Sequence, residues 1–151
     1  MNLLEQFSLR HLQLSHLHVE LREVIERDQA VQSHVELNLT PREMQQPPDG
    51  GVTYQITARL TCLGSKPGGS AEEALFNIQL VMHAAYQQFR GEPVDFAHFS
   101  RHHTTLARQL YPMIQQQLRP LLLQLGLEQI TLPLDVVDLA AVPESRSTSV
   151  H

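Results

Sequence analysis

The sequence predicts an α+β fold in which a four-stranded antiparallel sheet is backed by one long helix. Apolar and polar residues alternate with a period of two in four runs across the first two thirds of the chain. Two loops rich in glycine and proline, 45–51 and 64–70, lie between successive runs. After Gly91-Glu92-Pro93 the apolar residues recur at intervals of three and four, which is the period of an amphipathic helix.

The first strand is predicted between Phe7 and Leu21, with two interruptions in its alternation. Its apolar residues form three groups: Phe7 and Leu9, then Leu12 and Leu14, then Leu17, Val19 and Leu21. The phase slips once after Leu9 and again after Leu14, and each slip adds one residue. A β-bulge or a switch of sheet face produces such a slip, whereas a helical period fits these positions less well.

A charged connection follows from Leu21 to Ala30, and three more strands are predicted after it. The apolar positions of the next two runs are Val35, Leu37 and Leu39, and then Tyr54, Ile56, Ala58, Leu60 and Cys62. The fourth run, 75–86, is apolar on both faces, which is typical of a buried strand. Because flexible loops separate successive runs, we expect an antiparallel meander in which each strand pairs with the next.

One amphipathic helix is predicted from about Val94 to Leu125, with Gly126 as its C-terminal stop. Pro112 and Pro120 lie inside this segment. Proline removes a backbone donor and crowds the preceding turn, so we expect a kink or a break near each of them. A short extended segment is predicted at 130–134, after the helix.

Composition disfavours several classes of function. The 151 residues include 16 acidic and 11 basic side chains, a net charge of -5 with histidine neutral, which disfavours binding of nucleic acid. No apolar run approaches the roughly 20 residues of a spanning helix, so no membrane insertion is expected. The N-terminus lacks a signal-peptide pattern, which favours a cytoplasmic protein. The length fits one domain, expected at 1–142, followed by a polar, disordered tail at 143–151.

Motifs for catalysis or metal binding are weak. His98, His102 and His103 fall close together, and His16 and His18 would share one strand face, but neither group has a third ligand at a zinc-like spacing. No nucleophile elbow, phosphate loop or dinucleotide motif occurs. We therefore predict a protein that is not an enzyme, with no catalytic residue, no metal and no cofactor. An enzyme or metal protein ranks third among the hypotheses and depends on the histidines alone.

The runs resemble, in order and spacing, the SecB family of protein-export chaperones over about residues 7 to 139. The matching segments are Phe7-x-Leu9-x-x-Leu12, Leu17-x-Val19, Val35-x-Leu37-x-Leu39, Tyr54-x-Ile56-x-Ala58-Arg59-Leu60-Thr61 and Leu110-Tyr111-Pro112. The last is the most specific, because the family has an aromatic-proline step at that place in its helix. The chain is identified as a divergent member that lacks the family's C-terminal helix, since only Ala140-Ala141-Val142-Pro143-Glu144-Ser145 and a few more residues follow Leu139.

The resemblance implies a chaperone that binds unfolded or secretion-bound polypeptides in apolar grooves, without ATP, as a dimer of dimers. It also implies delivery to the translocase motor SecA, which family members contact partly through acids on the exposed sheet face. The matching positions here are His16, Glu20 and Asn77, of which only Glu20 is acidic. The alternatives are a SecB-like chaperone dedicated to one client, such as an antitoxin, and a structural or adaptor protein on the same fold.

Two sets of apolar residues are candidate binding sites. Client side chains are expected to meet the connection and the second strand, at Leu21, Val24, Ile25, Val35, Leu37 and Leu39. The helix carries apolar residues on more than one stripe, so we expect a homodimer or homotetramer to form through it. The residues expected at this interface are Phe96, Phe99, Leu106, Leu110 and Ile114.

Overall fold

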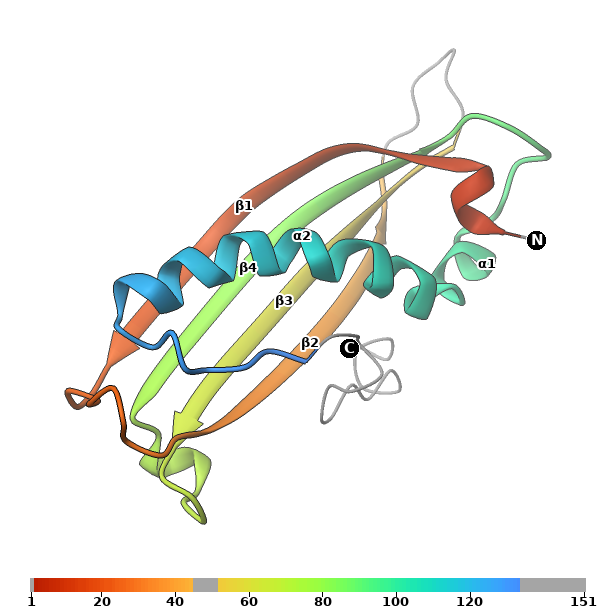
Figure 1. Ribbon diagram of the computed structural model, residues 1–151. Coiled ribbons are helices and arrows are strands. Elements are labelled where there is room, and N and C mark those ends of the chain that lie inside the picture. The colour runs from red at the N-terminus through yellow and green to blue at the C-terminus, as the bar shows by residue number, and fades with distance from the viewer. Residues whose placement is uncertain (1, 45–51, 134–151) are drawn as a thin grey trace.

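The computed structural model describes residues 2–44 and 52–133. It contains the strands β1 (Phe7–Leu21), β2 (Gln32–Glu43), β3 (Thr53–Ser65) and β4 (Phe76–Gln88), the helices α1 (Phe96–Ser100) and α2 (His103–Gln124), and the short 3-10 helices η1 (Leu3–Glu5) and η2 (Ala71–Glu73). The strands form one sheet, and α2 crosses one of its faces (Figure 1). The predicted α+β architecture is therefore confirmed.

The strand order in the sheet is β1-β4-β3-β2, and every neighbouring pair is antiparallel. β2, β3 and β4 form the expected meander, but β1 pairs with β4 instead of β2. The predicted meander is therefore confirmed for β2, β3 and β4, and it does not extend to β1. Residues 22–31 carry the chain from one edge of the sheet to the other (Figure 1), a distance that a hairpin loop of about two to five residues cannot span.

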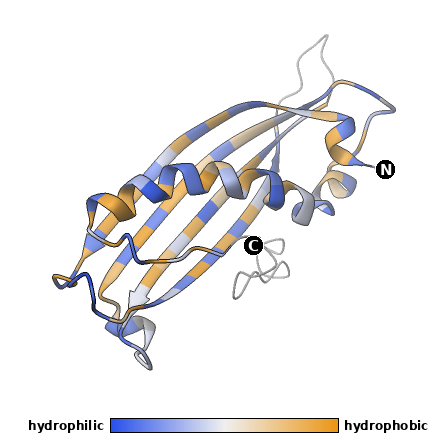
Figure 2. Cartoon of the chain, in the orientation of Figure 1, coloured by the Kyte–Doolittle hydropathy of each residue, from blue (hydrophilic) through white to orange (hydrophobic). Residues whose placement is uncertain are grey.

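Two bulges keep the apolar residues of β1 on one face of the sheet. The register between β1 and β4 shifts between Leu9 and His11 and again between Leu14 and His16. These are the two places where the alternation of the sequence slips, so the prediction of bulges is confirmed. As a result, every apolar residue of β1 pairs with a buried residue of β4 and lies on the face that α2 covers. Figure 2 shows the same alternation of apolar and polar residues along the other strands.

The hydrophobic core lies between this face and α2. The buried residues of α2 are Leu106, Ala107, Leu110, Tyr111, Ile114, Leu118 and Leu122. Gly126, with a φ of 75°, ends the helix in the left-handed conformation that glycine adopts without strain. The chain then turns back beside α2, where the Tyr111 hydroxyl donates a hydrogen bond to the carbonyl of Pro133 at 2.8 Å. Leu127, Ile130 and Leu132 of this returning segment belong to the core.

The single helix predicted from Val94 to Leu125 is divided into α1 and α2. The division lies at His102, whose φ of -94° and ψ of 29° depart from helical values. Pro112 and Pro120 lie inside α2, and neither ends the helix. Both prolines are exposed, so the carbonyls that they leave without a helical partner face water, which explains why no break occurs there.

A cluster of aromatic rings joins α1 to the sheet. Phe99 of α1 lies 5.1 Å from Phe7, 4.7 Å from Tyr54 and 5.9 Å from Tyr86, measured between ring centroids. The Tyr54 hydroxyl donates a hydrogen bond to the carbonyl of Val94 at 2.6 Å, just before the helix begins. These contacts hold the start of the helical layer over three different strands.

Several predictions concern residues that the structure does not describe. They are the loop at 45–51, the end of the extended segment at Leu134, the domain limit at 142, the tail at 143–151 and the missing C-terminal helix. The segment predicted to be extended contributes Ile130 and Leu132 to the core without forming a strand.

Candidate polypeptide-binding surface

Four of the six residues predicted to bind clients are buried. Val35, Leu37 and Leu39 of β2 and Ile25 of the connection all belong to the hydrophobic core of the chain. The same core includes residues of the segment that follows α2, which sequence alternation did not place over the sheet. The assignment of these four side chains to an accessible surface is therefore corrected, because the chain covers them itself.

The other two residues are exposed, and they extend a row of leucines on β1. Leu21 is 38% exposed and Val24 is 86% exposed. Leu14, at 39%, and Leu17, at 42%, lie on the same face of β1 as Leu21. We call Leu14, Leu17, Leu21 and Val24 the leucine strip. Its strand residues lie on the face that carries α2 but at the edge of the sheet, where they are only partly covered.

Leu14 and Leu17 were missed as surface residues by sequence reasoning. Their alternation correctly places them on the core face of the sheet, and that pattern is the same for buried and uncovered positions. β1 and β2 are both edge strands, but the leucines of β2 share a core with the segment after α2, whereas Leu14 and Leu17 of β1 are only partly covered. No signal in the spacing of β1 itself could have shown this exposure.

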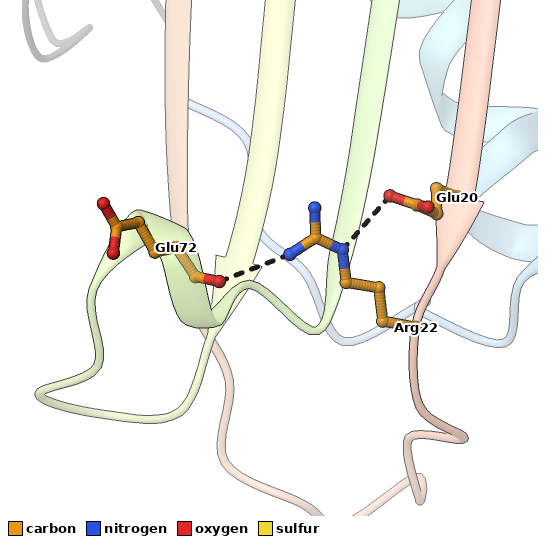
Figure 3. A network of polar contacts seen from close by, with 3 residues as sticks. All are labelled: Glu20, Arg22 and Glu72. Carbon is orange, nitrogen blue, oxygen red and sulfur yellow. Dashed lines mark hydrogen bonds and ion pairs between the residues drawn. The ribbon is translucent and has the colours of Figure 1, made fainter.

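A network around Arg22 fixes the start of the connection next to Val24 (Figure 3). The Arg22 Nε donates to Glu20 Oε1 at 3.1 Å, and Nη1 donates to the carbonyl of Glu72 at 3.3 Å. The backbone N–H of Arg22 also donates to the carbonyl of Leu75 at 2.8 Å. Beside it lies a depression of about 350 Å³ lined by Arg22, Lys66 and three glutamates together with Leu75. Its charged lining makes it unsuitable for an apolar segment.

The connection is held again further along, so that Val24 projects between two anchors. Ile25, directly after Val24, is buried. Arg27 Nη2 lies 3.9 Å from Glu128 Oε1, which links the connection to the segment after α2. The connection thus presents Val24 to solvent while the adjacent Ile25 packs into the core.

β1 also offers backbone groups to a partner. It is 15 residues long and lies at one edge of the sheet, so in the described part of the chain it pairs only with β4. The backbone groups along its other side have no sheet partner there, and such an edge can accept an extended strand. Apolar side chains and an open edge therefore occur together on β1.

The residues predicted at an interface between chains are mostly part of the core. Phe99, Leu106, Leu110 and Ile114 are fully buried against the sheet of the same chain. Phe96 is partly buried, with its ring 5.6 Å from that of Tyr54. This corrects their assignment to contacts between protomers, because the stripe that they form is the one the chain's own sheet covers.

Reactive groups are few in the described residues. Burial raises the pKa of the Cys62 thiol to about 12, so this thiol stays protonated at neutral pH and is a poor nucleophile. The rings of His98 and His102 lie 5.0 Å apart, and His102 Nδ1 is 2.9 Å from the carbonyl oxygen of His98. Among the described residues no three His, Cys, Asp or Glu side chains are grouped so that they could hold a metal ion.

Within residues 2–44 and 52–133, no helix has the length and apolar character required to cross a membrane.

Comparison with known proteins identifies the fold. No family model matches the chain, and neither does the sequence of any curated protein. Among solved structures, it is similar to the SecB-like chaperone Rv1957 of Mycobacterium tuberculosis, determined in complex with a ChAD peptide from the HigA1 antitoxin Rv1956. The TM-score is 0.70 at 14% identity, and the match covers 87% of this chain and 93% of that chain. The chain therefore has the fold of a SecB-like chaperone, as the resemblance of its sequence predicts.

Proposed function

We propose that the protein is a chaperone, not an enzyme, and that it binds unfolded polypeptide segments along the leucine strip without ATP. The observation that carries this proposal is the exposure of Leu14, Leu17, Leu21 and Val24 along an edge strand. An extended segment can bury its apolar side chains against the strip while its backbone pairs with the edge of β1. The SecB-like fold supports the proposal, because the similar chaperone was determined with a peptide bound.

The expected affinity is modest. Full burial of a leucine side chain contributes about 1.5–3 kcal/mol, and the strip residues are already partly covered, so each gains less than that. Ordering an unfolded segment opposes this gain by about 0.5–1.5 kcal/mol for each immobilised flexible side chain. The balance favours weak binding with rapid release, which suits a carrier that must pass its client on.

SecA is not part of this proposal. Of the three positions at which family members would carry acids, two carry no carboxylate, since they are His16 and Asn77. The third, Glu20, is already paired with Arg22 at 3.1 Å. Of these three positions, therefore, only one offers a carboxylate, and that carboxylate is engaged within the chain.

Replacing Leu21 and Val24 together with aspartate is expected to weaken binding of an unfolded client by at least about tenfold. The change removes two apolar contacts and places two charges where an apolar side chain must dock, and tenfold corresponds to about 1.4 kcal/mol. The measurement is fluorescence anisotropy with reduced, carbamidomethylated lysozyme as the unfolded client. Native lysozyme, which hides its apolar residues, is expected to bind much more weakly than the unfolded form.

Leu123→Asp is the matched control for this experiment. Leu123 is 60% exposed on α2 and lies outside the leucine strip, so its replacement should leave client affinity unchanged. Circular dichroism would verify that all variants remain folded. Unchanged affinity in the Leu21 and Val24 variant, or equal binding of native and unfolded lysozyme, would count against the proposal.

A chaperone dedicated to one client is the second candidate, and the antitoxin peptide bound to the similar chaperone favours it. In that case the strip would still be needed, but affinity would be high for one polypeptide and absent for unrelated unfolded proteins. A panel of several alkylated, unfolded proteins distinguishes a general chaperone from a dedicated one. Binding to most of the panel supports a general chaperone, and tight binding to one polypeptide with none to the panel supports a dedicated one.

Self-association remains a prediction, now placed on the middle of the leucine strip, where a second copy and a client would compete for the same side chains. Because the predicted helix residues are buried, Leu14 and Leu17 are the apolar side chains that a second copy could cover. We expect a dimer or tetramer at micromolar concentration and a shift toward monomer when both leucines are replaced with aspartate. Size-exclusion chromatography with light scattering measures both. A monodisperse monomer of the unmodified chain at neutral pH would refute this prediction.

A further inference from the structure

The face of the sheet opposite α2 has an uneven distribution of charge. Directly paired residues on this outer face form rows across β1, β4, β3 and β2. Three adjacent rows contain two arginines and three histidines, and their other side chains are glutamine, threonine, asparagine, alanine and valine. We call the five basic residues the cationic patch: Arg42, Arg59, His11, His16 and His83.

No carboxylate lies within these three rows. The outer face carries its acids in the next two rows, at Glu36 and Glu20. Each already has a partner, since Glu20 accepts from Arg22 at 3.1 Å and Glu36 Oε2 lies 3.8 Å from His34 Nε2. Arg59, near the centre of the outer face, takes part in no ion pair among the described residues, and its side chain is exposed.

The patch is formed from residues of all four strands. Row by row, Arg59 of β3 lies between Val81 of β4 and Asn38 of β2, while His16 of β1 lies on the far side of Val81. Neighbouring strands are about 4.8 Å apart, so the charges are spread over a width that one extended peptide can cover. A contact of 3.1 Å between His83 Nδ1 and Thr57 Oγ1 orients the histidine ring on this surface.

The charge of the patch is opposite to that of the chain as a whole. The chain has a net charge of -5, whereas the patch carries two arginines and three histidines with no acid. An acidic partner is therefore attracted to this face and repelled by the rest of the surface. A long nucleic-acid backbone would meet that repulsion along most of its length, while a short acidic segment would not.

We propose that the cationic patch is a docking surface for an acidic polypeptide segment, rich in aspartate or glutamate, on the face opposite the leucine strip. This surface is separate from the proposed client site, so the chain would bind two different partners on its two sheet faces. Arginine and protonated histidine pair with carboxylates through charge-assisted hydrogen bonds. The nearest additional groups that influence the patch are His18 and Glu36, which lie in the adjacent row.

The probe is a fluorescein-labelled peptide of alternating glutamate and serine, with a lysine-serine peptide of equal length for comparison. We expect the acidic peptide to bind at low salt and the basic peptide not to bind.

Arg59→Glu is expected to weaken binding of the acidic peptide by about fivefold or more, since it removes the central cation and adds a like charge. Arg119→Glu is the matched control: Arg119 is exposed on α2, on the opposite side of the sheet, and its replacement changes the net charge equally. We expect this control to stay within about twofold of the unmodified chain. Equal losses in the two variants would overturn the proposal, because they would indicate general charge attraction.

Two further outcomes would also overturn it: no binding of the acidic peptide at pH 6, or tighter binding of a DNA duplex than of the peptide. The result is independent of the proposed chaperone function. Arg59→Glu should retain affinity for unfolded lysozyme, and the variant with aspartate at Leu21 and Val24 should retain affinity for the acidic peptide. If one proposal failed, the other could therefore still be tested.

Discussion

Replacement of Phe99 with alanine is expected to lower the free energy of unfolding by about 3–5 kcal/mol. The Phe99 ring is fully buried and contacts rings from β1, β3 and β4, the nearest of them Tyr54 at 4.7 Å. Its loss would leave a cavity at the place where α1 joins the sheet, with rigid aromatic walls that cannot collapse to fill it. The measurement is urea unfolding followed by circular dichroism.

Phe89→Ala provides the matched control, because it removes the same atoms from an exposed position. Phe89 is 56% exposed, and its ring centroid lies 5.5 Å from the guanidinium carbon of Arg90. We expect a loss within about 0.5 kcal/mol, as for most surface substitutions. If the two variants lost equal stability, the aromatic cluster would not be the anchor of the helical layer.

Replacement of Gly64 with alanine is expected to cost about 1–3 kcal/mol or more. Gly64 of β3 pairs with Phe76 of β4, and the phenylalanine ring lies directly over it. A methyl group at Gly64 would lie 1.9 Å from Phe76 Cε2, well inside van der Waals contact. The ring is fully buried, so it can move only by disturbing the core. Thermal or urea unfolding measures the loss.

A double-mutant cycle with Phe76→Leu tests the stated cause. The smaller side chain makes room for the methyl group, so Gly64→Ala should cost less in the Phe76→Leu background than in the unmodified chain. Equal costs in the two backgrounds would place the strain elsewhere. A stabilised Gly64→Ala chain would show that the lower entropy of its unfolded state outweighs the clash.

The local structure of the strands could be predicted in detail from the sequence. Alternation depends on the two faces of a strand, and the core imposes it residue by residue. This is why the slips after Leu9 and Leu14 coincide with the two bulges. The pairing partner of β1 could not be predicted in the same way, because alternation indicates which face is apolar and says nothing about the neighbouring strand.

The helices, too, could be predicted from the sequence only in part. The spacing of apolar residues locates α2 and its buried stripe, but no proline or glycine marks the division at His102. The two prolines that suggest a break lie on the exposed side of α2, where water can solvate the carbonyls that they leave unpaired. The prolines therefore indicated a break at positions where the helix continues.

The candidate surfaces depend on tertiary structure even more strongly. Leu17 and Leu37 belong to alternating runs on the two edge strands of the sheet, yet Leu17 is exposed and Leu37 is buried. Likewise, Arg59, His16 and His83 come from three strands, and only the register of the sheet brings them onto one face. Residue type identifies such groups as possible binding residues, but their combination is a property of the fold.

The bulges of β1 make the length of this strand as important as its composition. Leu12 and Leu14 occupy even positions, whereas Leu17, Val19 and Leu21 occupy odd ones, and the unpaired Ser15 is the extra residue that places both sets on the same face. Deleting Ser15 would move each β1 residue that precedes it to the opposite face of the sheet. Leu12 and Leu14 would turn toward the outer face, and Gln13 would turn toward α2. A one-residue deletion here would therefore disturb a whole half-strand, although every remaining residue is unchanged.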